Sequence, residues 1–253
     1  VISRELLQKK EFSALEKYLK SILKQFTKDK IFNKSNHEQK LMLLTYLTNS
    51  LYENQKLEES LDFAKKLKKA MNEHNRILYD NYLFYYYNAL VINYSKLDYS
   101  KALKVLNEAK NNKKIQELPT FSAFIYLNMG LIYYSQKKYK MSIKNISRLI
   151  LQQDFLNLSK SFQLKILITE IQVRFHLNQS DLIEEKIKLL HRKYSKILKN
   201  NTRDKKIIEI IKSLIYCTNT NLDKNLQQKI NELKKTYNKE KDIINYNEWV
   251  LNI

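Results

Sequence analysis

Glycine, proline and cysteine are almost absent from this chain. Among its 253 residues there is one of each, Gly130, Pro119 and Cys217, where average usage would give about eighteen glycines and about a dozen prolines. β-Hairpins and phosphate-binding loops need residues that adopt positive φ angles, which is mainly a property of glycine. The scarcity of glycine therefore argues against dinucleotide-binding, P-loop and nucleophile-elbow motifs, and it predicts an all-helical fold.

The lone cysteine and the spacing of the histidines argue against a catalytic or metal centre. A single thiol forms no internal disulfide and no zinc site built on several thiolates, and the apolar stretch before Cys217 favours a buried side chain over a nucleophile. No two of the four histidines have the spacing that places metal ligands on one helix face. We therefore predict no metal, no cofactor and no enzymatic activity. The histidines are His37, His74, His176 and His191.

No segment of the sequence resembles a membrane span or an export signal. Lys, Asn or Glu interrupts every apolar stretch well before the length of about 18 residues that a spanning helix needs. Residues 1–5 contain no apolar export signal, although a chain that begins with Val1 is compatible with a preceding segment. With one thiol in the chain, the expected location is the reducing cytoplasm, without a membrane partner.

The clearest periodic segment covers residues 123–150. Apolar residues recur there at helical spacing, a polar break follows at 135–138, and a second amphipathic stretch begins at Tyr139. This pattern predicts a helix–turn–helix hairpin, in which the small residues Gly130 and Ser142 let each helix approach a neighbour closely. The periodic positions are Tyr126, Met129, Gly130, Tyr133, Tyr139, Ile143, Ile146 and Ile150.

Related segments occur elsewhere in the chain. Residues 138–143 resemble residues 98–103 and 56–61, at offsets of 40 and 42 residues. Weaker copies occur around residues 10–15 and 173–187. A period of about 40 to 45 residues is typical of a solenoid built from helical hairpins. The alternative is a helical bundle without repeats.

The residues of the 123–150 hairpin resemble the tetratricopeptide repeat, which has aromatic, Leu-Gly, tyrosine and small-residue positions in this order. The resemblance extends over roughly residues 1–190 and implies a right-handed α-solenoid of helix–turn–helix hairpins. Its period exceeds that of the standard repeat, and the family's helix-ending proline is missing from most units. Such long units resemble the peptide-sensing domains of bacterial regulators, in which a segment preceding Val1 would carry DNA-binding or effector function. The matching residues are Tyr126, Met129, Gly130, Tyr133, Tyr139 and Ser142.

The repeat pattern ends near residue 204. Residues 205–253 contain separate apolar stripes, one through Ile207, Ile210 and Ile211, and they include the only tryptophan, Trp249. Because solenoids need atypical terminal units to cover the last apolar face, we predict a solenoid over 1–204 and a C-terminal helical cap over 205–253 that packs on it. Trp249 is expected in the packing of this cap.

The resemblance also implies a ligand-binding surface on the concave face of the solenoid. Asparagine amides can pair with peptide groups, and tyrosines offer flat contact area with a hydroxyl. The alternative is that these abundant residue types serve only the fold. A chaperone-type carboxylate clamp is not expected, since Thr45 stands where that clamp has a lysine. The candidate groove residues are Asn49, Tyr87, Asn88, Tyr94, Asn128 and Tyr134, with Arg174 as a carboxylate partner.

The chain carries a net charge of +20, and its basic residues are densest between Lys186 and Lys206. Four of them recur at helical spacing and predict a continuous basic stripe that could follow phosphates. Only six of the 46 basic residues are arginine, the residue best suited to phosphate and base recognition. A solvated surface that reflects an AT-rich genome, or an acidic protein partner, would explain the charge as well. The stripe consists of Lys188, Arg192, Lys196 and Lys199.

Taken together, these patterns favour a non-enzymatic scaffold that binds a protein or peptide, possibly an acidic one, in a groove. The alternative is a nucleic-acid-associated helical protein that uses the basic stripe. The sequence contains no signal for the oligomeric state.

Overall fold

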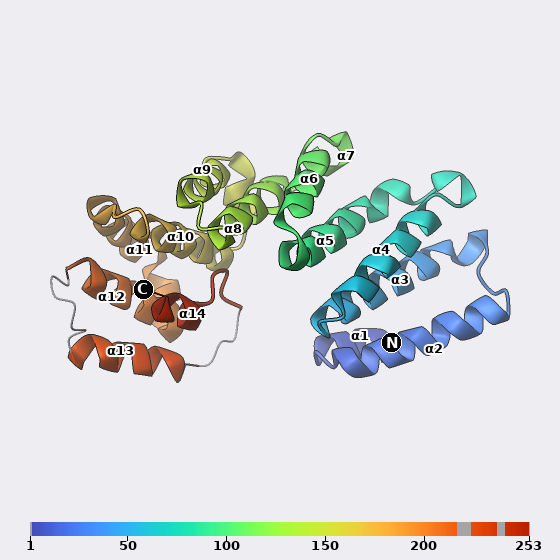
Figure 1. Cartoon of the computed structure of the whole chain (residues 1–253), viewed down its shortest axis with the longest axis horizontal. Coiled ribbons are helices and arrows are strands. Elements are labelled where there is room, and N and C mark those ends of the chain that lie inside the picture. Colours follow the sequence, from blue (N-terminus) through green and yellow to red (C-terminus); the bar gives the residue numbers. More distant parts are fainter. Residues whose placement is uncertain (1, 217–223, 237–240, 253) are drawn as a thin grey trace. The chain divides into compact units, whose positions relative to one another are not determined.

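The computed structural model describes residues 2–216, 224–236 and 241–252, and all regular elements in these ranges are helices (Figure 1). The prediction of an all-α fold is therefore confirmed. The chain forms two compact units, residues 1–118 and residues 119–253, which divide at the only proline. No helix among the described residues is long and apolar enough to cross a membrane. Cys217 lies outside the described residues.

The first unit is a series of helices in which each one packs against the next in the chain. Short 3₁₀ turns, η1 (Lys34–Asn36) and η2 (His74–Arg76), precede α3 and α5. The amphipathic α2 and α4 bury one face each, including Leu15, Leu19 and Leu67. The helices are α1 (Ile2–Gln8), α2 (Phe12–Lys28), α3 (His37–Glu53), α4 (Leu57–Met71), α5 (Tyr79–Leu97), α6 (Tyr99–Lys110) and α7 (Lys113–Gln116).

The second unit continues the same hairpin arrangement from Pro119 onward. It begins with a π-helical segment, η3 (Ala123–Leu127), that leads directly into α8, and a 3₁₀ turn, η4 (Gln153–Asn157), precedes α10. The helices are α8 (Asn128–Ser135), α9 (Tyr139–Ile150), α10 (Lys160–Phe175), α11 (Ser180–Asn200), α12 (Thr202–Ile215), α13 (Lys224–Lys234) and α14 (Tyr246–Leu251).

The C-terminal residues pack on the last hairpin of the second unit. α12 begins at Thr202, near the predicted change of pattern, and it contacts both α10 and α11. Trp249 is buried and its ring lies 5.3 Å from that of Phe175, centroid to centroid, in an edge-on contact. The compact units nevertheless divide at 118/119 and not at 204/205, because residues 205–253 bury their apolar faces against helices of the same unit.

Polar side chains mark the helix starts where glycine and proline are missing. Asp98 accepts hydrogen bonds from the backbone N–H groups of Ser100 and Lys101, at 3.0 and 3.1 Å, and so caps α6. Asn112 and Asn201 cap α7 and α12 in the same way. Short polar side chains thus satisfy the unpaired N–H groups of these helices and set where each one begins.

Four hairpins share one turn geometry. In each, a residue with φ between 53° and 61° stands two positions before the second helix. Its N–H and the next N–H donate back to carbonyls of the last turn of the first helix, which is the Schellman arrangement. None of these positions is a glycine, although left-handed backbone favours glycine. The residues are Lys10, Gln55, Lys137 and Asn178.

The two helices of a hairpin are also joined at an equivalent buried point. The Ser142 hydroxyl donates to the Gly130 carbonyl at 2.8 Å, and the Ser60 hydroxyl donates to the Thr48 carbonyl at 2.9 Å. Both bonds connect residues 12 positions apart. A Cβ added to Gly130 would lie 2.8 Å from Cγ1 of Ile146, so the predicted close approach at Gly130 is confirmed. The matching contacts support a repeat-like fold.

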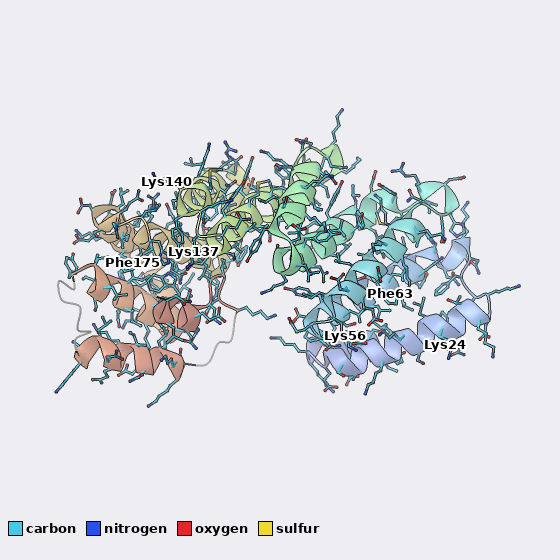
Figure 2. All side chains as sticks on the ribbon, viewed as in Figure 1. Lys24, Lys56, Phe63, Lys137, Lys140 and Phe175 are labelled. Atoms are coloured by element: carbon cyan, nitrogen blue, oxygen red, sulfur yellow. The ribbon has the colours of Figure 1, made fainter. Side chains whose placement is uncertain are left out.

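We expect Lys137→Gly to stabilise the protein. Lys137, labelled in Figure 2, has a φ of 57°, and left-handed backbone costs a non-glycine residue about 1 kcal/mol relative to glycine. The free energy of unfolding from urea titration should rise by about that amount. Lys144→Gly, inside α9, is the matched control and should lower it by about 1 kcal/mol. Equal losses in both variants would contradict the turn assignment.

We expect Gly130→Ala to destabilise the protein, because the new methyl group collides with Ile146. The free energy of unfolding should fall by about 1–3 kcal/mol, the usual cost of overpacking. In an Ile146→Ala background the same change should be neutral or stabilising, since the space is then free. A double-mutant cycle measures this coupling, and additive effects would show that the contact is unimportant.

Candidate functional site

A hollow of about 250 Å³ lies in the first unit between α3 and α5, the first helices of successive hairpins. Its walls are mostly apolar, and α1 and α4 each contribute one leucine. Three of the lining residues, Thr45, Asn49 and Asn88, had been expected on an inner face from the sequence. The lining consists of Leu7, Thr45, Tyr46, Thr48, Asn49, Leu67, Phe84, Tyr85, Asn88, Ala89 and Ile92.

The amides of Asn49 and Asn88 are available to a ligand. Both side chains are partly exposed, and neither makes a hydrogen bond to another described residue. Asn93, one helical turn further along α5, is different: it is buried and its amide donates to the Ser60 hydroxyl and the Ala89 carbonyl, at 2.9 and 2.8 Å. The structure thus separates asparagines that hold helices together from those that face the hollow.

The two other predicted residues of this unit, Tyr87 and Tyr94, do not line the hollow. Tyr87 packs against Tyr86, with ring centroids 5.7 Å apart, and burial raises the pKa of its hydroxyl. The ammonium group of Lys101 on α6 lies 5.8 Å from the ring centroid of Tyr94. Tyr87 and Tyr94 are seven residues apart and share one face of α5, which is turned about 100° from the face of Asn88.

Tyr85 is the groove residue that the sequence reasoning missed. It precedes Asn88 by three residues on α5 and is 48% exposed beside the hollow. The i, i+3, i+7 spacing of Tyr85, Asn88 and Ile92 would have indicated this face. It was obscured because the run of aromatic residues at 82–87 places large side chains on every side of the helix.

In the second unit the predicted groove residues engage other parts of the chain. The Asn128 amide donates to the Phe124 carbonyl at 2.7 Å, within its own helix. The Tyr134 hydroxyl lies 3.3 Å from Nε2 of His176, and burial, with Tyr139 nearby, raises the pKa of Tyr134 well above its ordinary value. These two side chains therefore support the packing of α8 and are not grouped in a hollow with Arg174.

Arg174 is already paired with a carboxylate of its own chain. Its guanidinium donates to Oε1 of Glu170 at 2.7 and 3.0 Å and to the Gln179 side chain at 2.8 Å. Lys186 binds the same Glu170 oxygen at 2.9 Å. A ligand carboxylate would have to compete with Glu170, so Arg174 is a poor anchor for one.

The predicted basic stripe on α11 is interrupted. The backbone of Tyr194 is non-helical (φ −118°, ψ 19°), and its hydroxyl donates to Oε1 of Gln163 at 3.0 Å, which holds the kink between Arg192 and Lys196. Lys188 forms an ion pair with Glu184 at 3.2 Å. The four cations are exposed but do not form one continuous row.

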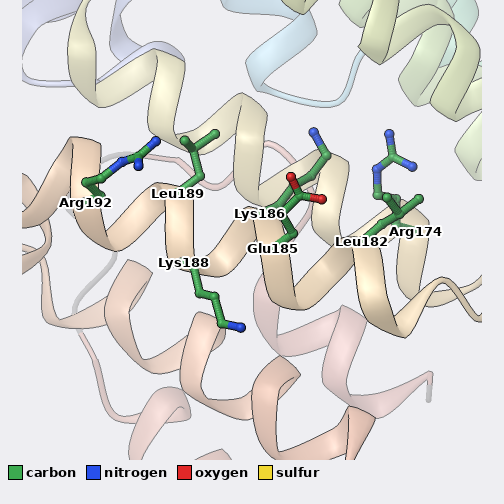
Figure 3. Close-up of a pocket in the computed structure, with 7 residues that line it drawn as sticks. All are labelled: Arg174, Leu182, Glu185, Lys186, Lys188, Leu189 and Arg192. Atoms are coloured by element: carbon green, nitrogen blue, oxygen red, sulfur yellow. The ribbon is translucent and has the colours of Figure 1, made fainter.

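A second hollow, of about 540 Å³, lies beside the first half of α11 (Figure 3). It combines basic side chains with two partly exposed leucines, Leu182 and Leu189. Figure 3 shows the Lys188 side chain pointing away from those of Lys186 and Leu189. The cations at this hollow are thus spread in direction and include the paired Arg174 and Lys186.

Comparison of the chain with protein-family models, curated proteins and solved structures found no match. The candidate site therefore depends on the geometry of the described residues alone. Of the two hollows, the one between α3 and α5 has unpaired polar groups set in an apolar lining, which is the usual composition of a binding site.

Proposed function

We propose that the chain is a non-enzymatic scaffold of tetratricopeptide-like hairpins that binds a peptide segment of a partner protein in the hollow between α3 and α5. The observation that carries this proposal is the pair of unpaired amides, Asn49 and Asn88, beside an apolar hollow. An asparagine side chain offers one acceptor and a donor group, which match the C=O and N–H of a peptide unit.

The size and lining of the hollow favour a peptide side chain as the occupant. A volume of about 250 Å³ is below the range of about 300–1,000 Å³ that is usual for small-molecule and cofactor pockets. None of the described residues lining it is a carboxylate, imidazole, thiol or ammonium group. The hollow thus suits an apolar anchor residue with its backbone held at the rim, and it offers no acid–base pair for catalysis.

The charge of the chain favours an acidic partner. The lining is neutral, so the net charge of +20 acts at longer range, by steering a negatively charged segment toward the protein. We therefore propose a peptide with one apolar anchor residue and acidic neighbours. Its affinity should depend mainly on the anchor and the amides, and its association rate on the salt concentration.

Selection from a random peptide library tests the proposal. The library is selected on the full chain, and enriched peptides are measured by calorimetry at low and high salt. Because a hydrogen bond contributes about 0.5–1.5 kcal/mol, Asn49→Ala and Asn88→Ala should each weaken binding by about 3- to 10-fold. Asn81→Ala, an exposed asparagine on the same helix α5, is the matched control and should leave the affinity unchanged.

The alternative of nucleic-acid binding through α11 predicts the opposite pattern. Binding of a nucleic acid would fall steeply with salt and would be abolished by Lys188→Glu with Lys196→Glu, while the Asn88→Ala variant would behave as wild type. Recovery of no peptide that distinguishes the wild type from the Asn49→Ala, Asn88→Ala double variant would overturn the groove proposal.

A further inference from the structure

A cluster of three metal-ligating side chains lies at the end of the first unit's central hairpin. His37 is the first residue of α3, and Glu73 and His74 follow α4. Since α3 and α4 run in opposite directions, the start of one meets the end of the other. The ligating atoms of these three residues all lie within 4.8 Å of one another.

His37 is buried without a partner for its ring nitrogens. Its side chain is 2% exposed, and neither Nδ1 nor Nε2 makes a hydrogen bond within the structure described. Buried polar groups are nearly always hydrogen-bonded, so two unpaired nitrogens on one buried ring call for an explanation. The ring faces the other two members of the cluster: Nδ1 lies 4.0 Å from Oε2 of Glu73, and the His74 ring is edge-on at a centroid distance of 4.7 Å.

We propose that His37, Glu73 and His74 form a binding site for a divalent transition-metal ion, with Zn²⁺ as the occupant. Two imidazole nitrogens and one carboxylate oxygen are a ligand set that zinc accepts, whereas Mg²⁺ and Ca²⁺ prefer oxygen ligands alone. The three protein ligands leave a fourth position for water. Ligand atoms around tetrahedral zinc are about 3.4 Å apart, so binding requires the cluster to contract slightly.

The electrostatic environment of His37 suits a metal ligand. Burial and the adjacent His74 lower its pKa, and the Glu73 carboxylate and the Ala70 carbonyl offset this in part. Lys40 also lowers the pKa. The neutral imidazole that results is the form that coordinates a metal. The Ala70 carbonyl is an acceptor for the ring nitrogen that does not face the ion, which is the usual way a ligating histidine is oriented.

Lys40 occupies the place of the cation in the metal-free protein. Its ammonium group donates to both oxygens of Glu73, at 2.9 and 2.7 Å. A metal ion would replace this ammonium group as the positive partner of Glu73. Lys40 is therefore a competitor for the site, and its removal should strengthen metal binding, an effect that a purely structural salt bridge would not produce.

Metal titration of the full chain, freed of any purification tag and of bound metal, tests the proposal. Zn²⁺ binding is followed by calorimetry, and Co²⁺ is added as a spectroscopic probe of tetrahedral nitrogen and oxygen ligation. We expect one equivalent to bind. The Glu73→Gln and His74→Ala variants, which change partly exposed residues, should bind at least about 10-fold more weakly. His191→Ala, at an exposed position on α11, is the control and should bind as wild type.

The Lys40→Gln variant completes the test, because it keeps all three ligands. It should bind Zn²⁺ more tightly than wild type by several-fold, and the metal should raise its melting temperature more. Failure of the wild type to bind one equivalent would overturn the proposal. Equal losses in His74→Ala and His191→Ala, or unchanged or weaker binding in Lys40→Gln, would overturn it too. Circular dichroism confirms that each variant is folded.

Discussion

Close contact between the two helices of each hairpin is the constraint on which the rest of the structure depends. The chain reverses direction through turns that use left-handed backbone without glycine, as at Gln55 and Lys137. A buried hydroxyl then joins the helices, from Ser60 to the Thr48 carbonyl and from Ser142 to the Gly130 carbonyl. Only small side chains allow this approach, because at Gly130 even a methyl group would meet Ile146. The hairpins are therefore set by steric fit as much as by hydrophobic burial.

Both sites proposed for the first unit follow from the geometry of its central hairpin. The side of α3 that faces α5 supplies Thr45 and Asn49 to the hollow. The start of the same helix supplies His37, which meets the residues that follow α4. One helix thus presents two different chemistries, an apolar hollow with amides along its side and a set of metal ligands at its end. A metal bound at His37 would hold α3 to the end of α4 and stabilise the hairpin that carries half of the hollow.

The excess of basic residues has more than one role. Several cations are buried parts of the second unit: Arg203 pairs with Asp242, and Lys165 lies 3.4 Å from Asp204. Arg174 and Lys186 share Glu170. Removing one partner of such a buried pair leaves an uncompensated charge, so these residues serve folding. The exposed lysines remain as the source of the long-range positive field. Composition alone does not separate the two groups, because burial decides the role of each charge.

The sequence by itself determined the helical fold and its hairpins, because periodicity and the lack of glycine and proline act locally along the chain. The units around Tyr139, Tyr99 and Leu57, the close approach at Gly130 and the packing of Trp249 were all predictable in this way. Only the tertiary structure decided which amides stay unpaired: Asn49 and Asn88 face a hollow, whereas Asn128 bonds to its own helix. It also brought His37 to His74, which sequence spacing had excluded as metal ligands. The physical reason is that a binding site depends on contacts between distant segments, which no local pattern records.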